Sequence, residues 1–171
     1  MKARRVKGID PAAPLDDGVA RVVRVRLDEL CSFMPQASDP EEVEAVHDLR
    51  IAAKRLRYLL ELVAPRFGAY AGTAARRVRA LQDITGRIHD CDELLPRLEA
   101  DPGLAPLAAE LRVRRAACFA EFLAQWTDLE RKGFRARLEY ALTERGTMPG
   151  RSHDGNTAPG PAAVRSEVPR A

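Results

Sequence analysis

The stretch VHDLRIAAKRLRYLL, residues 46–60, decides the fold class. Its apolar residues recur with the period of an α-helix. At about 100° per residue from His47, Leu49, Leu56 and Leu60 fall between about 160° and about 220°, on one side of the helix. This side is predicted to face a hydrophobic core, and the charged residues of the stretch avoid it.

Cationic residues occupy the other side of the same helix. Arg50 falls at about 300°, Lys54 at about 340° and Arg57 at about 280° around the helix axis. Tyr58 falls at about 20°, so these four residues form an outward stripe with His47. Like charges three or four residues apart cost a few tenths of a kcal/mol each. A multiply charged anion would offset this cost, because guanidinium groups pair with phosphate oxygens through two hydrogen bonds.

Two further residues bear on this stripe. Arg55 falls at about 80°, off the stripe, where its aliphatic stem is expected to cover the edge of a bundle. Glu61, at about 320°, is the only carboxylate far enough along the stripe to offset its cations. Any surface helix shows a charged outer face, but such faces usually mix signs. The pattern therefore favours ligand binding over a merely solvated face.

The chain as a whole is predicted to be all-α. Apolar residues follow a helical period in four segments, at about 16–33, 39–65, 69–98 and 104–143. Pro35 should stop the first helix, Asp39 should cap the second, Pro96 should end or kink the last turn of the third, and Gly133 should bend the fourth. Short links join long helices into antiparallel neighbours, so an up-down four-helix bundle is expected.

Composition limits the possible classes of protein. The 171 residues fit one domain, with 46% hydrophobic and only 5% aromatic residues, and the net charge of +3 does not by itself name a partner. No apolar run suits a membrane span or a secretory signal, so a cytoplasmic protein is expected. Three widely spaced cysteines argue against a disulfide framework or a metal knuckle.

The two ends of the chain lack the apolar period. Residues 1–13 are expected to form a flexible basic N-terminus, and residues 146–171, rich in Gly, Pro, Ser and Arg, a disordered tail. The bundle itself is assigned to residues 14–145.

The third predicted helix repeats the pattern of the second. Arg79, Gln82, Gly86 and His89 lie on the side away from its apolar face. A glycine inside a helix costs about 1 kcal/mol relative to alanine, which suggests that another helix or a ligand approaches closely at Gly86, with helix packing the favoured interpretation. Histidines titrate near neutral pH, so His47 and His89 could make binding of an anion depend on pH.

Two motifs carry a resemblance to a known family. The sequences HDLRI (47–51) with KRLRY (54–58), followed by LQDITGRIHD (81–90), resemble the CHAD family of histidine-bearing α-helical domains that bind inorganic polyphosphate. The resemblance covers about residues 15–145. It implies ligand contacts for His47, Arg50, Lys54, Arg57 and His89, with Arg55 and Arg79 as second-rank candidates. Tyr58 joins the candidate site by its place on the stripe.

The resemblance also has a consequence for assembly. A full domain of that family consists of two similar four-helix bundles, whereas this chain resembles one bundle, the second. A homodimer, or dimerisation driven by polyphosphate, is therefore expected, with the residues around Gly86 in the contact.

Three other functions are compatible with parts of the sequence. The dipeptides His47-Asp48 and His89-Asp90 are superficially like those of metal-dependent phosphohydrolases, but neighbouring helix positions point apart, and the further pair at residues 153–154 lies in the tail. No catalytic residue, metal or cofactor is therefore expected. Nucleic-acid binding is the serious alternative, although base recognition needs more aromatic residues than Tyr58. A helical scaffold remains open.

Overall fold

The computed structural model describes residues 2–144, and their secondary structure is helical. The elements are α1 (Leu15–Ala37), α2 (Val43–Val63), α3 (Gly68–Glu99), the short 3-10 helix η1 (Pro102–Leu104), α4 (Ala105–Arg131) and α5 (Phe134–Thr143). The all-α prediction is confirmed. The tail predicted at residues 146–171 lies outside the described residues. None of the described helices is long and apolar enough to cross a membrane.

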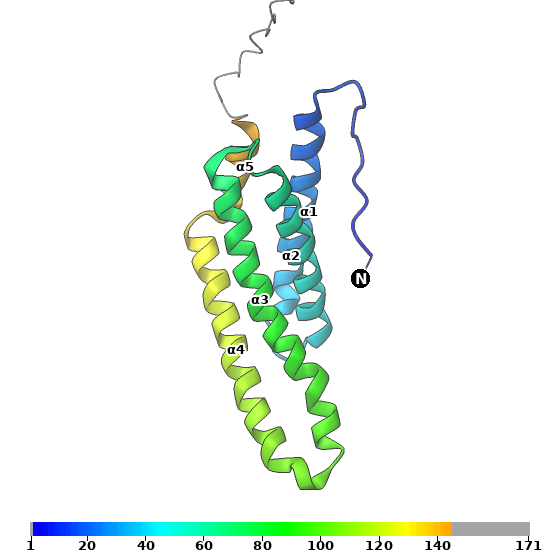
Figure 1. Cartoon of the computed structure of the whole chain (residues 1–171), viewed down its shortest axis with the longest axis vertical. Coiled ribbons are helices and arrows are strands. Elements are labelled where there is room, and N and C mark those ends of the chain that lie inside the picture. Colours follow the sequence, from blue (N-terminus) through cyan, green and yellow to red (C-terminus); the bar gives the residue numbers. More distant parts are fainter. Residues whose placement is uncertain (1, 145–171) are drawn as a thin grey trace, which may run out of the picture.

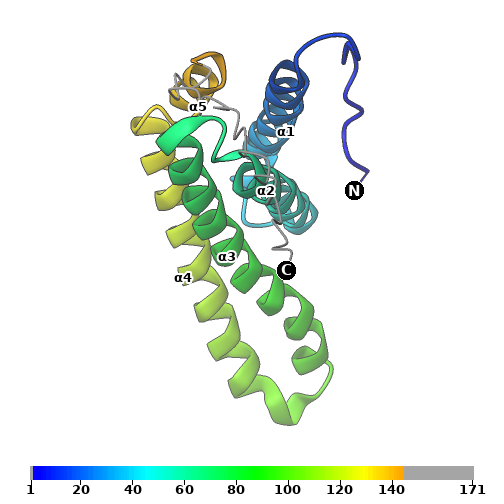
Figure 2. The ribbon, with the colours of Figure 1, turned by 45° about the horizontal axis from the view of Figure 1, so that its top comes forward.

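The helices are arranged as a row that is incompletely closed. α1 packs on α2, α2 on α3 and α3 on α4, while α5 contacts α1, α3 and α4 (Figures 1 and 2). Within the described residues α1 and α4 do not pack directly on each other. The predicted up-down bundle of four helices is not confirmed, because the described residues form five α-helices.

The fourth predicted helix is interrupted at Gly133. This residue adopts a left-handed conformation with φ of 62°, and α4 and α5 meet there at an abrupt break. A left-handed residue cannot continue a right-handed helix, and glycine adopts that conformation without a steric penalty. Gly133 therefore separates two helices and does not merely bend one.

Two helix ends differ from their predictions. Pro35 does not stop α1, because it lies in the last turn, where its missing N–H removes at most one hydrogen bond; α1 continues to Ala37. Pro96 lies in the last turn of α3, which ends at Glu99, close to the predicted end at about residue 98. Asp39 does not cap α2: its side chain accepts a hydrogen bond from the Glu41 N–H in a turn, and α2 begins at Val43.

The core is continuous across the helices. Leu49, Leu56 and Leu60 of α2 are fully buried, as their spacing predicts. α4 adds Phe122 and Trp126 to the same cluster. This packing fixes the rotation of α2, so its cationic residues lie at its surface and along its boundary with α3.

Candidate functional site

Two histidines mark the place where α2 meets α3. His47 Nδ1 and His89 Nδ1 are 3.4 Å apart, and the ring centroids are 4.8 Å apart. Both rings are half-buried. The sequence motifs on successive helices are therefore brought into direct contact.

The histidine contact sets the register of the two helices. α2 and α3 are consecutive antiparallel helices with the same rise per residue, so residues equally far from the contact lie level with each other. This places Arg50 level with Gly86, Lys54 with Gln82 and Arg57 with Arg79. We call these eight residues the α2–α3 seam: His47, Arg50, Lys54, Arg57, Arg79, Gln82, Gly86 and His89.

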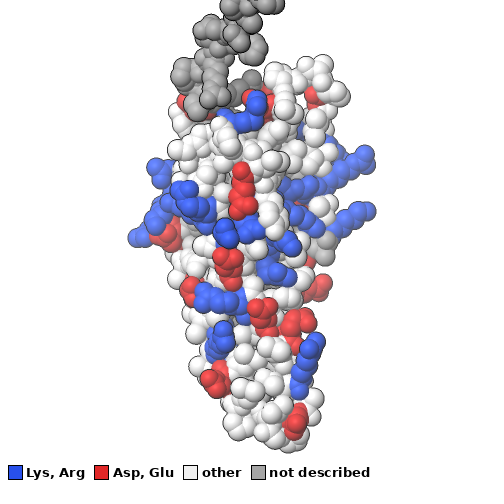
Figure 3. Space-filling model, in the orientation of Figure 1, with Lys and Arg blue, Asp and Glu red and all other residues white. Residues whose placement is uncertain are grey.

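The seam is cationic and about 15 Å long, from ten residues at about 1.5 Å each. Among the described residues, no carboxylate forms an ion pair with Arg50, Lys54 or Arg79. Arg57 Nε lies 3.7 Å from Glu61 Oε1, so the predicted compensation by Glu61 is present as one weak pair. In Figure 3, Lys and Arg side chains gather across the middle of the molecule.

Three polar atoms at the seam are buried without a hydrogen-bond partner among the described residues: Arg50 Nε, Arg57 Nε and Gln82 Oε1. Buried polar groups are almost always paired, because an unpaired one loses its hydration without compensation. Two of the three are donors on cationic side chains. Such donors are suited to the oxygens of a bound anion.

The surroundings of His47 favour its neutral form. Burial is the main cause of the lowered pKa of this imidazole, followed by the neighbouring His89 and the positive charge of Arg50, while Asp48 opposes the shift. An anion bound between these groups would raise the pKa of His47, as Asp48 does.

Tyr58 and Arg55 lie beside the seam but not in it. The Arg57 guanidinium lies over the Tyr58 ring, 4.3 Å from its centroid, and the ring is 52% exposed. Arg55 pairs instead with Glu29 of α1, at 3.3 Å. The sequence predicts that Arg55 lies off the stripe, and in the structure Arg55 does lie on the other side of α2, towards α1.

Gly86 does not serve close helix packing within the described chain. A Cβ built at this position would meet no atom within 4 Å, apart from its own helix backbone and chain neighbours. Within the described chain, no other helix therefore packs closely against Gly86, and the space beside it is open. Gln82 was left out of the predicted site residues, although its position one turn before Gly86 on the same side of the helix could have identified it.

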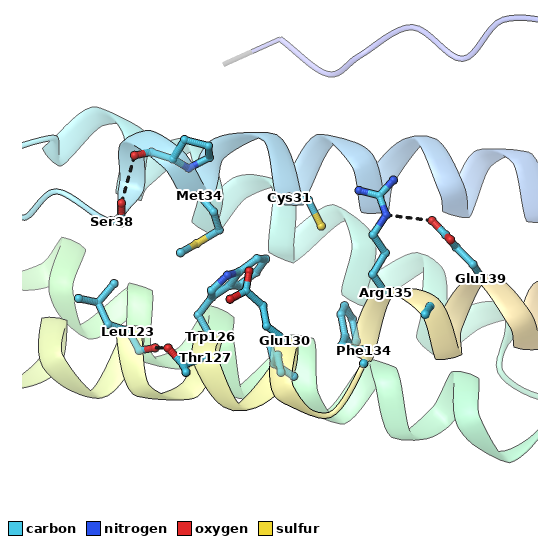
Figure 4. A pocket seen from close by; sticks show the side chains of 14 residues that line it. Cys31, Met34, Ser38, Leu123, Trp126, Thr127, Glu130, Phe134, Arg135 and Glu139 are labelled. Atoms are coloured by element: carbon cyan, nitrogen blue, oxygen red, sulfur yellow. Dashed lines mark hydrogen bonds and ion pairs between the residues drawn. The ribbon is translucent and has the colours of Figure 1, made fainter.

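Other features of the surface do not contribute to the seam. A crevice of about 800 Å³ lies between α1 and the α4–α5 break, with Cys31, Met34, Trp126 and Phe134 among its lining residues (Figure 4). No seam residue lines it. Within residues 2–144, no three His, Cys, Asp or Glu side chains converge as metal ligands.

The fold and the seam define an all-helical protein that carries a cationic interhelical surface. The model of the CHAD domain family matches residues 2–99, more than half of the chain, and the chain therefore belongs to the CHAD domain family. The match covers α1 to α3 and contains every seam residue, while α4 and α5 lie outside it. No curated protein and no solved structure gives a match. CHAD domains are associated with polyphosphate binding in general.

Proposed function

We propose that this chain binds inorganic polyphosphate along the α2–α3 seam, as a binding protein and not as an enzyme. The observation that carries the proposal is a row of cations with one weak carboxylate partner, Glu61, among the described residues. Two of these cations, Arg50 and Arg57, have buried Nε atoms without a hydrogen-bond partner there. A chain of phosphates supplies repeated oxygen acceptors along a line. A row of Arg and Lys that runs about 10 Å along α2, within a seam about 15 Å long, matches a linear ligand better than a compact one.

The absence of catalysis is part of the proposal. Binding of phosphates by Arg and Lys needs no nucleophile and no general base. The histidines contact each other through Nδ1, and this pair is better suited to adjusting the charge of the seam than to holding a metal with a third ligand.

Nucleic acid is the competing ligand, because its phosphates would meet the same cations. Beside the seam, Tyr58 offers an aromatic ring for stacking, but this ring is already covered on one side by Arg57. This favours recognition of phosphate over recognition of bases.

A competition experiment tests the proposal. Labelled polyphosphate is bound to the purified chain at one fixed salt concentration and displaced with RNA, duplex DNA or unlabelled polyphosphate at matched phosphate concentration. Polyphosphate should compete best, and its affinity should fall steeply as salt rises. Equal or tighter binding of duplex DNA would refute the assignment.

A pair of charge-reversed variants locates the site. Lys54→Glu should abolish binding, whereas Arg114→Glu should retain it, because Arg114 is exposed on α4, away from the seam. Both variants change the net charge equally. Equal losses of affinity would show that only the total charge matters.

A further inference from the structure

The N-terminal segment is attached to the bundle, close to the α2 surface. Residues 2–14 form no helix or strand and run alongside α1, on the side of α1 away from α4 (Figures 1 and 2). The Arg4 N–H donates to Glu29 Oε1 at 3.0 Å, and Arg4 Nη2 donates to Ser32 Oγ at 2.9 Å. Arg21 Nε donates to the Lys7 carbonyl oxygen. The segment is therefore held at two points on α1.

Glu29 is the centre of this attachment. Its side chain is 1% exposed, and it accepts hydrogen bonds from Arg26 at 2.5 Å and from Arg55 of α2 at 3.3 Å, besides the Arg4 N–H. A buried carboxylate is tolerated only when such donors surround it. One carboxylate thus joins α1, α2 and the N-terminal segment.

Gly8 allows the second attachment. Its φ is 69°, a left-handed conformation, and a Cβ at this position would lie 2.9 Å from Arg21 Nη2. A larger residue would be strained and would also displace the guanidinium that holds Lys7. The path of residues 2–7 therefore depends on glycine at this position.

The attachment places the segment at the edge of α2 opposite the seam. Arg55 shares Glu29 Oε1 with Arg4 and directly follows the seam residue Lys54. The width of a helix, about 10 Å, separates the two edges. Lys2, Arg5 and Lys7 are exposed along the attached segment. In Figure 3, Lys and Arg side chains also project at the edge of the molecule where Figure 1 shows this segment.

We propose that Lys2, Arg5 and Lys7 form a second row of cations for polyphosphate, parallel to the seam, so that a long chain crosses α2 and contacts both rows. This inference rests on the proposed function and extends its site. Rows about a Debye length apart act on the same polyanion, and each additional phosphate contact adds to the counterions released on binding. A short chain that fills only the seam gains nothing from the second row. The attached segment therefore gives the protein its preference for long chains.

The test compares two triple variants with equal loss of charge. Lys2→Ser, Arg5→Ser and Lys7→Ser together remove the second row. The control replaces Arg97, Arg112 and Arg114 by serine. These three arginines are exposed on the far parts of α3 and α4. Binding is measured with triphosphate and with long-chain polyphosphate over a range of salt concentrations. For the first variant, long-chain affinity should fall at least tenfold, the slope of log K against log salt should decrease by about 2, at roughly 0.7 per lost contact, and triphosphate affinity should be unchanged.

A third variant separates position from charge. Gly8→Val keeps all the cations but disturbs their attachment, so it should weaken long-chain binding while leaving triphosphate binding and the helical signal intact. Long-chain binding by the first triple variant equal to that of the control would overturn the inference, as would unchanged long-chain binding by a folded Gly8→Val chain. If the unaltered chain binds no polyphosphate of any length, the proposed function itself fails. The two failures are thus distinguishable.

Discussion

Replacing Arg50 by methionine should separate binding from stability. Arg50 is half-buried at the seam, and its Nε has no hydrogen-bond partner among the described residues. An unpaired buried donor costs about 1–3 kcal/mol. Methionine keeps a similar unbranched stem for packing and removes both the donor and the charge.

The expected magnitudes follow from these two losses. Removal of the donor offsets the packing lost with the guanidinium, so the free energy of unfolding of the free protein should stay the same or rise by about 1 kcal/mol. For a domain of this size, about 1 kcal/mol corresponds to roughly 3–4 °C in Tm. Loss of a charged hydrogen bond to phosphate costs about 1.5–3 kcal/mol of binding, a factor of roughly 10 to 150 in Kd.

Thermal unfolding with and without polyphosphate measures both quantities. Ligand at 100 times its Kd stabilises the folded state by about 2.7 kcal/mol, so the unaltered chain should melt roughly 8–10 °C higher with polyphosphate. For Arg50→Met, the Tm without ligand should be equal or higher, and about half or more of the increase should disappear. Lys54→Met is the matched comparison at an exposed position. A loss of more than about 1 kcal/mol in the free Arg50→Met protein would refute this reasoning, because Arg50 would then be a structural residue.

Three other outcomes are expected. Leu56→Ala should lower the free energy of unfolding by about 2–5 kcal/mol because Leu56 is fully buried, and denaturant titration that shows less than about 1 kcal/mol would contradict the packing. Folding lowers the pKa of His47, so below the ordinary histidine pKa near 6.5 this ring binds more protons in the unfolded chain than in the folded one. The free energy of unfolding should therefore fall as pH drops below about 6.5. Polyphosphate binding should strengthen over the same range, because the anion favours the protonated ring. Melting and binding measured from about pH 7.5 to about pH 5 check both trends, and a His47→Gln variant should flatten them. Sedimentation should show a homodimer that increases with polyphosphate and weakens at high salt; a strict monomer that binds tightly under all conditions would show that one copy suffices.

The sequence predicts most of the second helix and its stripe. Leu49, Leu56 and Leu60 are buried as their spacing requires, and His47 and His89 meet although 42 positions separate them. Periodicity succeeds here because both helices are long and each has a single apolar face. The short link between these two helices predicts that they are antiparallel neighbours, but the direct contact of the two histidine rings was not predicted.

Other features depend on information that is not local. The Asp39 side chain can cap a helix or close a turn, and the neighbouring residues select the turn. Gly133 inside an apolar pattern is compatible with a bend or a break, and only its left-handed conformation decides. The sequence around Glu29 does not predict that this carboxylate is buried. Its burial depends on Arg55 and the N-terminal segment, which are distant in sequence and surround it in the fold.

The partly buried arginines show why a binding surface can be predicted from the sequence as a stripe but not as a site. Arg50 and Arg57 lie on the flank of α2 between its exposed and apolar faces, and their Nε atoms are buried without a hydrogen-bond partner among the described residues. A solvated stripe leaves such donors hydrated, whereas this packing leaves them desolvated while nearby carboxylates remain few. Under the proposed function, phosphate oxygens in the seam would compensate this cost, so the same packing that weakens the free protein would strengthen its binding. α4 and α5 lie outside the family match, yet they contribute Phe122, Trp126 and Leu138 to the core that holds α3 in place. The seam therefore depends on the whole described bundle, although its residues all come from α2 and α3.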